Sequence, residues 1–188
     1  PNSERIGRMR PWLFEFQAWI ARDWNMPQDA WWWNPVAAPT AHCQRRFGLM
    51  RPSIKACVWG GAIDCFRNQD VVLWHPSAAM ANMDREDRAW RYHPSGVHVR
   101  PANICIASDA RGGVTPFNLL PLSNAASAGD GDSRGHGAAT PLRLCEWWTR
   151  YLTPYGGLCL DPFAGAGTVG VACIKEGFRF LGIEREPD

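Results

Sequence analysis

The stretch of residues 157–184, GLCLDPFAGAGTVGVACIKEGFRFLGIE, constrains the fold more than any other part of this 188-residue chain. Residues 158–160 form a short apolar run, which is long enough for a buried strand and too short for a helix. Residues 178–183 predict a second buried strand, with Glu184 at its carboxyl end. Two buried strands joined by a helical segment predict a βαβ unit, and therefore an α/β fold with parallel strands.

A glycine-rich turn follows the first of these strands. Gly165, Gly167 and Gly170 form a G-x-G-x-x-G pattern, and the apolar residues after it predict a helix that ends at Gly177. Glycine lets the backbone pass close to a ligand, and the helix presents N–H groups at its start. Glu184 at the next strand tip can accept two hydrogen bonds from a ribose diol. We therefore expect a nucleoside-containing cofactor; the alternative is an ordinary glycine-rich turn.

The residues before the first glycine discriminate between cofactors. A dinucleotide-binding turn usually follows its strand directly, whereas Asp161, Pro162, Phe163 and Ala164 intervene here. A carboxylate buried at a strand end suits a ligand with an ammonium group, because an unpaired buried charge is costly. S-adenosylmethionine has an ammonium group and a ribose diol and lacks a pyrophosphate, so it fits the pattern. A nicotinamide or flavin cofactor, and with it an oxidoreductase, is the alternative.

Residues 161–168, DPFAGAGT, resemble the cofactor motif of the amino-directed DNA methyltransferases, which methylate N6 of adenine or N4 of cytosine. That motif usually reads D-P-F-x-G-S-G-T-T and is followed by a helix and by G-R-x-F-x-G-I-E; residues 177–184 read GFRFLGIE. The resemblance implies an α/β, Rossmann-like methyltransferase fold with a mostly parallel sheet and helices on both faces. It also implies S-adenosylmethionine as cofactor and double-stranded DNA as partner.

The resemblance assigns roles within the motif. It implies that Phe163, Gly165 and Gly167 line the cofactor. Asp161 would lie near the methionine ammonium, and Glu184 would hold the ribose hydroxyls. The remaining residues of the expected cofactor-binding set are Pro162, Thr168 and Thr140.

The cofactor motif lies near the carboxyl end, with one strand after it. This position predicts a permuted motif order and a chain cut at both ends, so that the fold is incomplete and the isolated chain inactive. The family's catalytic tetrapeptide, [DNS]-P-P-[YFW], does not occur in the sequence and is expected upstream of Pro1. Asn34, followed by Pro35 and Val36, heads a degenerate copy and is a rival catalytic candidate. A non-catalytic DNA-binding remnant is a further alternative.

Residues 30–122 are expected to form the target-facing, DNA-recognition part. Arg45, Arg46, Arg51 and Lys55 lie close together without an acid among them, which is typical of a loop that contacts phosphates beside an extruded base. A solvated surface loop is the alternative. Adenine and cytosine cannot be told apart as targets, because the tetrapeptide that usually distinguishes them does not occur.

The rest of the chain completes a single partial domain of residues 1–188. Residues 123–137 are small, polar and glycine-rich and predict a flexible loop, and residues 138–188 are the cofactor-binding part. Thr140 takes the place of a Lys in the family's H-P-T-x-K-P. Thr140 is expected to cap a helix whose first residue is Pro141.

Other elements follow from periodicity and turn residues. A core-facing amphipathic helix is expected at residues 9–24. Polar residues 75–100 suggest an insertion or a target-recognition segment. Short strands are expected at residues 30–35, 56–59, 70–74 and 104–106, with 56–59 and 70–74 paired antiparallel around Gly60 and Gly61. The resemblance implies a further short strand, P-x-N-[VL]-[IL], at residues 116–120, where Asn118 matches its Asn.

The composition bounds the class of protein. With 46% hydrophobic and 20% charged residues, the composition is that of a globular rather than a disordered chain. The net charge of +2 neither supports nor excludes binding to nucleic acid. The seven cysteines form no C-x-x-C pair and are expected as small core residues rather than disulfides. No metal site is expected, because His75, His93 and His98 lack ligand spacing. Without a signal peptide or a spanning run, a cytoplasmic, bacterial or phage-like protein is expected, of unknown oligomeric state.

Overall fold

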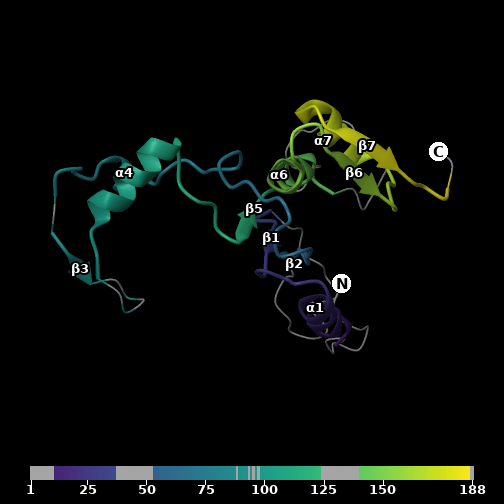
Figure 1. Ribbon diagram of the computed structural model, residues 1–188, viewed down its shortest axis with the longest axis horizontal. Coiled ribbons are helices and arrows are strands. Elements are labelled where there is room, and N and C mark those ends of the chain that lie inside the picture. Colours follow the sequence, from purple (N-terminus) through teal and green to yellow (C-terminus); the bar gives the residue numbers. More distant parts are fainter. Residues whose placement is uncertain are drawn as a thin grey trace. The chain divides into compact units, whose positions relative to one another are not determined.

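The computed structural model describes residues 11–36, 53–87, 89–92, 94, 96, 98–123 and 140–186. The chain divides into two compact units, one of Pro1–Arg67 with Phe117–Asp188 and one of Asn68–Pro116. Figure 1 labels most of the elements along the chain.

Helix α1, Trp12–Asp23, confirms the helix expected near the amino end. Pro11 stands at its N-cap, where a missing N–H is harmless. The expectation of a core-facing helix is only partly correct, because Leu13 is its one buried residue and the aromatic side chains on it are largely exposed. Its carboxyl end packs closely on the following chain, since a Cβ at Gly60 would lie 2.8 Å from the carbonyl oxygen of Trp24.

A three-stranded sheet follows, in the order β2-β1-β5. The central strand β1, Trp31–Trp33, pairs antiparallel with β2, Ile54–Ala56, and parallel with β5, Leu119–Pro121. Trp32 and Leu120 are register partners and both are buried. The strands expected within residues 30–35 and 116–120 are therefore confirmed, although both are shorter than these ranges.

The hairpin expected from residues 56–59 and 70–74 is wrong. Ala56 ends β2, which pairs with β1 instead. Residues 70–74 begin in a turn, in which the Asn68 side chain accepts the N–H of Asp70, and only Trp74 forms an isolated bridge, to Val114. A local side-chain hydrogen bond thus competes with the strand that the apolar residues 71–74 predict.

The second unit contains α3, Ala78–Ala81, the short hairpin of β3, Arg91–Tyr92, and β4, His98–Val99, and helix α4, Pro101–Arg111. The strand expected at residues 104–106 is wrong, because these residues lie inside α4. Pro101 at the start and Gly112 with φ 81° at the end define the helix, and these terminal signals outweigh the strand preference of the Ile-Cys-Ile run.

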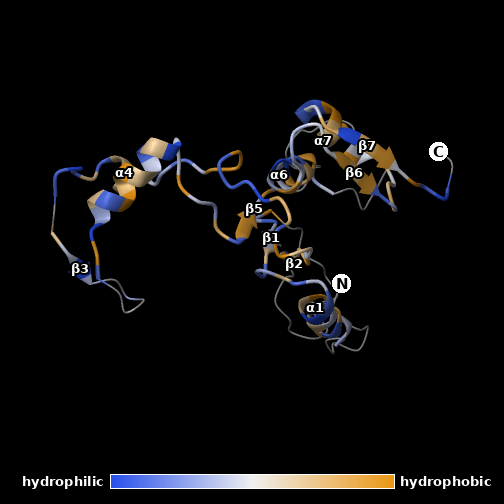
Figure 2. Ribbon diagram, viewed as in Figure 1, coloured by the Kyte–Doolittle hydropathy of each residue, from blue (hydrophilic) through white to orange (hydrophobic). Residues whose placement is uncertain are grey.

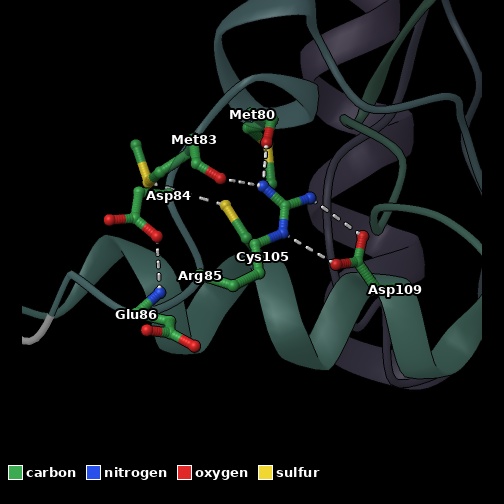
Figure 3. Close-up of polar contacts among 7 residues, drawn as sticks. All are labelled: Met80, Met83, Asp84, Arg85, Glu86, Cys105 and Asp109. Carbon is green, nitrogen blue, oxygen red and sulfur yellow. Dashed lines mark hydrogen bonds and ion pairs between the residues drawn. The ribbon is translucent and has the colours of Figure 1, made fainter.

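Arg85 forms hydrogen bonds with residues from two parts of the second unit, as Figure 3 shows. Its guanidinium donates to the carbonyl oxygens of Met80 and Met83 at 2.7 and 2.6 Å, and to the carboxylate of Asp109 at 2.9 and 3.2 Å. Beside it, the Cys105 thiol lies 3.7 Å from the sulfur of Met83. One side chain therefore ties the end of α3 to α4.

The carboxyl-terminal elements confirm the βαβ unit, but the expectation that both of its strands are buried is wrong. Leu158, Leu160 and Leu181 are each more than half exposed, because the two strands form a sheet by themselves among the described residues. Strand β6, Leu158–Asp161, leads through the glycine turn to α7, Thr168–Glu176, and then to β7, Arg179–Gly182, which lies parallel to β6. Helix α6, Leu142–Leu152, precedes β6 and packs on α7 (Figure 1). Figure 2 shows the hydrophobic character of β6 and β7.

Helix α6 begins differently from the expectation. Pro141 is its N-cap and Thr140 makes no cap, so the predicted capping by Thr140 is wrong. With φ −58° and ψ 131°, Pro141 still has extended backbone, and the helix begins only at Leu142. The helix buries Leu144 and Cys145.

An ion pair joins α6 to α7. Glu146 is 8% exposed, and its Oε1 accepts no hydrogen bond within the described part of the chain. Nζ of Lys175 lies 2.5 Å from this oxygen and compensates its charge. Arg150 and Glu176 form a second, longer pair at 3.4 Å.

Candidate cofactor site

The glycine turn continues the β6–β7 pairing beyond the strands. The N–H of Ile183 donates to the carbonyl of Asp161 at 2.9 Å, and the N–H of Ala164 donates to the carbonyl of Ile183 at 2.9 Å. Gly165 and Gly167 have φ values of 51° and 71°, which glycine adopts without strain. The turn therefore lies at the carboxyl ends of two parallel strands, where open α/β sheets bind their ligands.

Asp161 ends β6 but is only half-buried, so the expectation of a buried carboxylate is wrong. Its Oδ1 accepts the N–H of Phe163 at 3.0 Å, which is the local turn contact typical of Asp. The ring of Phe163 is 87% exposed. The structure thus places Asp161, Pro162 and Phe163 together at the mouth of the turn.

Glu184 reaches back to this turn from the end of β7. Its Oε2 accepts the N–H of Gly165 at 2.7 Å, and its Oε1 accepts the N–H groups of Arg185 and Glu186 at 2.8 and 3.0 Å. The sequence correctly predicts that Glu184 lies at the strand tip. It does not predict the hydrogen bond to Gly165, because nearly every residue has a backbone N–H and the residue type does not reveal what that group bonds. The same holds for the contact of Ala164.

Helix α7 begins at Thr168, as expected. Its N-cap is Gly167, which has no side chain to satisfy the N–H groups of the first turn. These groups point toward the glycine turn and favour negative charge or hydrogen-bond acceptors there. Gly170 lies directly on the ring of Phe180, so the third glycine serves close packing of helix on strand.

Three thiols lie beneath the turn in α6, β6 and α7. Burial, reinforced by the nearby Asp161 and Glu146 carboxylates, raises the pKa of Cys145 to about 11. Burial and the neighbouring Cys159 thiol raise the pKa of Cys173 to about 12. Such thiols are protonated at neutral pH, so they pack as apolar groups rather than act as nucleophiles.

Other expected site residues lie elsewhere. Thr140 is exposed just before α6. Asn34 follows β1, and its side chain accepts the N–H of Val36 at 3.2 Å. Lys55 lies in strand β2 and not in a loop, with Nζ 4.8 Å from the centre of the Trp32 ring. Three further residues of the expected phosphate-contacting group lie outside the described residues: Arg45, Arg46 and Arg51. The expected loop of residues 123–137 also lies outside them, apart from residue 123.

The described residues contain neither a metal-binding group nor a membrane-spanning helix. No group of three or more His, Cys, Asp or Glu side chains there could hold a metal ion. None of the helices in the same residues has the length and apolar character that a membrane span requires.

Comparison with known proteins identifies the family. The family N6_N4_Mtase, described as DNA methylase, matches residues 26–188. The type II methyltransferase M.PvuII of Proteus hauseri is 25% identical over 175 residues, which are 87% of this chain and 51% of that protein.

Solved structures show the fold. The PvuII DNA methyltransferase (cytosine-N4-specific) superposes with a TM-score of 0.63 at 18% identity, over 96% of this chain and 55% of that one. The M1.HpyAVI–SAM complex superposes with a TM-score of 0.56 at 17% identity, over 95% of this chain and 66% of that one. The expected α/β methyltransferase fold is therefore confirmed.

The chain spans about half the length of M.PvuII. Its match to the family nevertheless includes β1, the glycine turn and both strands of the βαβ unit. The chain belongs to the N6_N4_Mtase family of DNA methylases.

Proposed function

We propose that this chain contains the cofactor-binding part, residues 138–188, of a DNA methyltransferase, which transfers a methyl group from S-adenosylmethionine to N6 of adenine or N4 of cytosine in double-stranded DNA. The observation that carries the proposal is the meeting of Asp161, the glycine turn and Glu184 at the carboxyl ends of β6 and β7. The relatives named for methyltransferase activity support it.

Each residue of this group matches one part of the cofactor. The half-exposed carboxylate of Asp161 suits the methionine ammonium, and the acceptor oxygens of Glu184 suit the ribose hydroxyls. The exposed ring of Phe163 offers an apolar face for the adenine. Gly165 and Gly167 let the backbone approach without a Cβ. The M1.HpyAVI structure is a complex with the same cofactor, which supports this assignment.

DNA is the proposed partner. The target base must leave the helical stack before its exocyclic amine can meet the methyl group. We assign phosphate contacts to Lys55 with Arg45, Arg46 and Arg51. Because Lys55 Nζ lies over the Trp32 ring, its charge has a fixed place at the edge of the β2-β1-β5 sheet. A DNA partner supports our proposal that the protein is cytoplasmic, in a bacterial or phage-like setting.

The reaction needs an acceptor that hydrogen-bonds the amine. When bound, the cofactor supplies an electrophilic methyl on a sulfonium; the amine nitrogen forms the new bond, S-adenosylhomocysteine leaves, and the amine loses a proton. No [DNS]-P-P-[YFW] acceptor occurs in residues 1–188. We therefore expect the 188-residue chain alone to bind cofactor without methyl transfer. Robust turnover by this chain would instead assign the acceptor role to Asn34.

Isothermal titration tests the proposal. S-adenosylhomocysteine should bind the chain, and NAD should give no heat. Asp161→Asn should weaken binding about tenfold or more, because the amide keeps an acceptor oxygen but loses the negative charge that pairs with the ammonium. Ile174→Ala, a highly exposed position in the second half of α7, is the matched control and should bind as the parent does. Binding of NAD in place of S-adenosylhomocysteine would favour the oxidoreductase alternative.

A further inference from the structure

The carboxylate of Glu184 is already engaged by the protein's own backbone. Oε2 accepts from Gly165, 19 residues away in the sequence, and Oε1 accepts from Arg185 and Glu186. The three distances lie between 2.7 and 3.0 Å, so all are good hydrogen bonds.

The number of acceptor positions sets a limit on what else this carboxylate can hold. An ionised carboxylate offers about four lone-pair positions. At least three are used by backbone N–H groups, and a ribose diol asks for two more. Full engagement of the diol, which rests on the proposed function, therefore requires that at least one backbone N–H leave Glu184.

Gly165 is the donor that can leave. The N–H groups of Arg185 and Glu186 follow Glu184 directly, so their hydrogen bonds are set by the local path of the chain. Gly165 lies in the turn itself, and glycine can change its backbone angles at little cost. The separate bond from Ala164 to Ile183 at 2.9 Å keeps the turn attached to β7 when Gly165 moves.

We propose that the hydrogen bond from Gly165 to Glu184 is a conformational element of the cofactor site: the ribose of the cofactor replaces the Gly165 N–H on Glu184, and the glycine turn shifts as it does so. Ribose binding and turn conformation are thereby coupled through one carboxylate. The cost of breaking the hydrogen bond lowers the apparent affinity for the cofactor.

Nuclear magnetic resonance on the isotopically labelled 188-residue chain tests this coupling. The measured signals are the scalar couplings, through the hydrogen bonds, from the Glu184 carboxyl carbon to the amide nitrogens of Gly165, Arg185 and Glu186. All three should be present without ligand. Saturation with S-adenosylhomocysteine should abolish the Gly165 coupling and keep the other two.

Two variants separate this role from a purely structural one. Glu184→Ala should give the Gly165 amide an altered chemical shift without ligand, and should weaken S-adenosylhomocysteine binding about tenfold to a hundredfold. Glu186→Gln, which changes the neighbouring acid, should leave the Gly165 signal and the affinity unchanged within about twofold.

The outcomes distinguish the inference from the proposed function. Binding of S-adenosylhomocysteine with an intact Gly165 coupling, or with loss of the Arg185 or Glu186 coupling instead, overturns this inference alone. Absence of the Gly165 coupling before any ligand is added overturns it as well. No binding of S-adenosylhomocysteine at all overturns the proposed function, and the coupling with it.

Discussion

The backbone of Gly170 lies against the ring of Phe180. A Cβ added at Gly170 would stand 2.7 Å from Cε1 and 2.9 Å from Cδ1 of that ring. A Cβ at Gly182 would lie 2.8 Å from the same Cε1, so the ring fills the space between α7 and β7. This contact fixes the helix on the strand and thereby positions the glycine turn between them.

We predict that Gly170→Ala destabilises the chain by about 1–3 kcal/mol, because the added methyl overpacks this contact. The sign of this change in the free energy of unfolding is informative, since a Gly to Ala substitution inside a helix otherwise stabilises a protein by about 0.5–1 kcal/mol. Urea unfolding measures the difference, with Ile174→Ala on the exposed side of α7 as a control near zero. A stabilised Gly170→Ala variant would contradict the contact.

Removal of the ammonium of Lys175 should destabilise the fold, because it leaves a buried carboxylate unpaired. Lys175→Met leaves the Glu146 carboxylate without its compensating charge, and we expect a loss of about 1–3 kcal/mol, below that of a fully buried pair because Lys175 is half-exposed. The double variant Glu146→Gln with Lys175→Met should recover much of this loss in urea unfolding. Equal losses in Lys175→Met and in the double variant would show that the unpaired Glu146 carboxylate is not the source of the loss.

The second unit should lose stability in acid through Asp109. The hydrogen bond from Arg85 lowers the pKa of Asp109 below its ordinary value of 3.8. A carboxyl with a depressed pKa stabilises the fold above its unfolded pKa, and this contribution disappears as the pH falls through the folded pKa. The difference in melting temperature between the parent and Arg85→Met should therefore narrow from about pH 6 to about pH 2. A constant difference would mean that the carbonyl contacts of Arg85 carry its whole effect.

Cys145 and Cys173 should resist alkylation in the folded chain. Their pKa values of about 11 and about 12 leave almost no thiolate near pH 8, and both thiols are buried. Mass spectrometry after iodoacetamide treatment should find them modified only once the chain is unfolded in urea. Rapid modification of either thiol in the native chain would show that the layer beneath the turn is open.

The sequence predicts the cofactor half well because its signals are dense and local. Strand, glycine turn, helix and strand follow one another within residues 157–184, and Gly177 with φ 76° ends α7 where expected. The placement of Asp161 and Glu184 at the strand ends follows from the same order. What each carboxylate bonds does not follow, since both accept backbone N–H groups.

The target-facing part is predicted less well because its short elements depend on partners far apart in the sequence. Strand β1 pairs with β2 and with β5, which lies more than eighty residues further on. Residues 104–106 look like a strand alone and become helical through Pro101 and Gly112 at the ends of α4. Lys55, expected in a loop, lies in β2 because its neighbours pair with β1.

The most direct test of the account asks where the cofactor lies. Ultraviolet irradiation of the chain with S-adenosylmethionine that carries a radioactive methyl group should attach the label covalently, and peptide mapping locates it. We predict label in the peptide that contains Asp161, Phe163 and Glu184, lost in the presence of excess S-adenosylhomocysteine. Label confined to other peptides, or unaffected by the competitor, would contradict the assignment of this turn as the cofactor site.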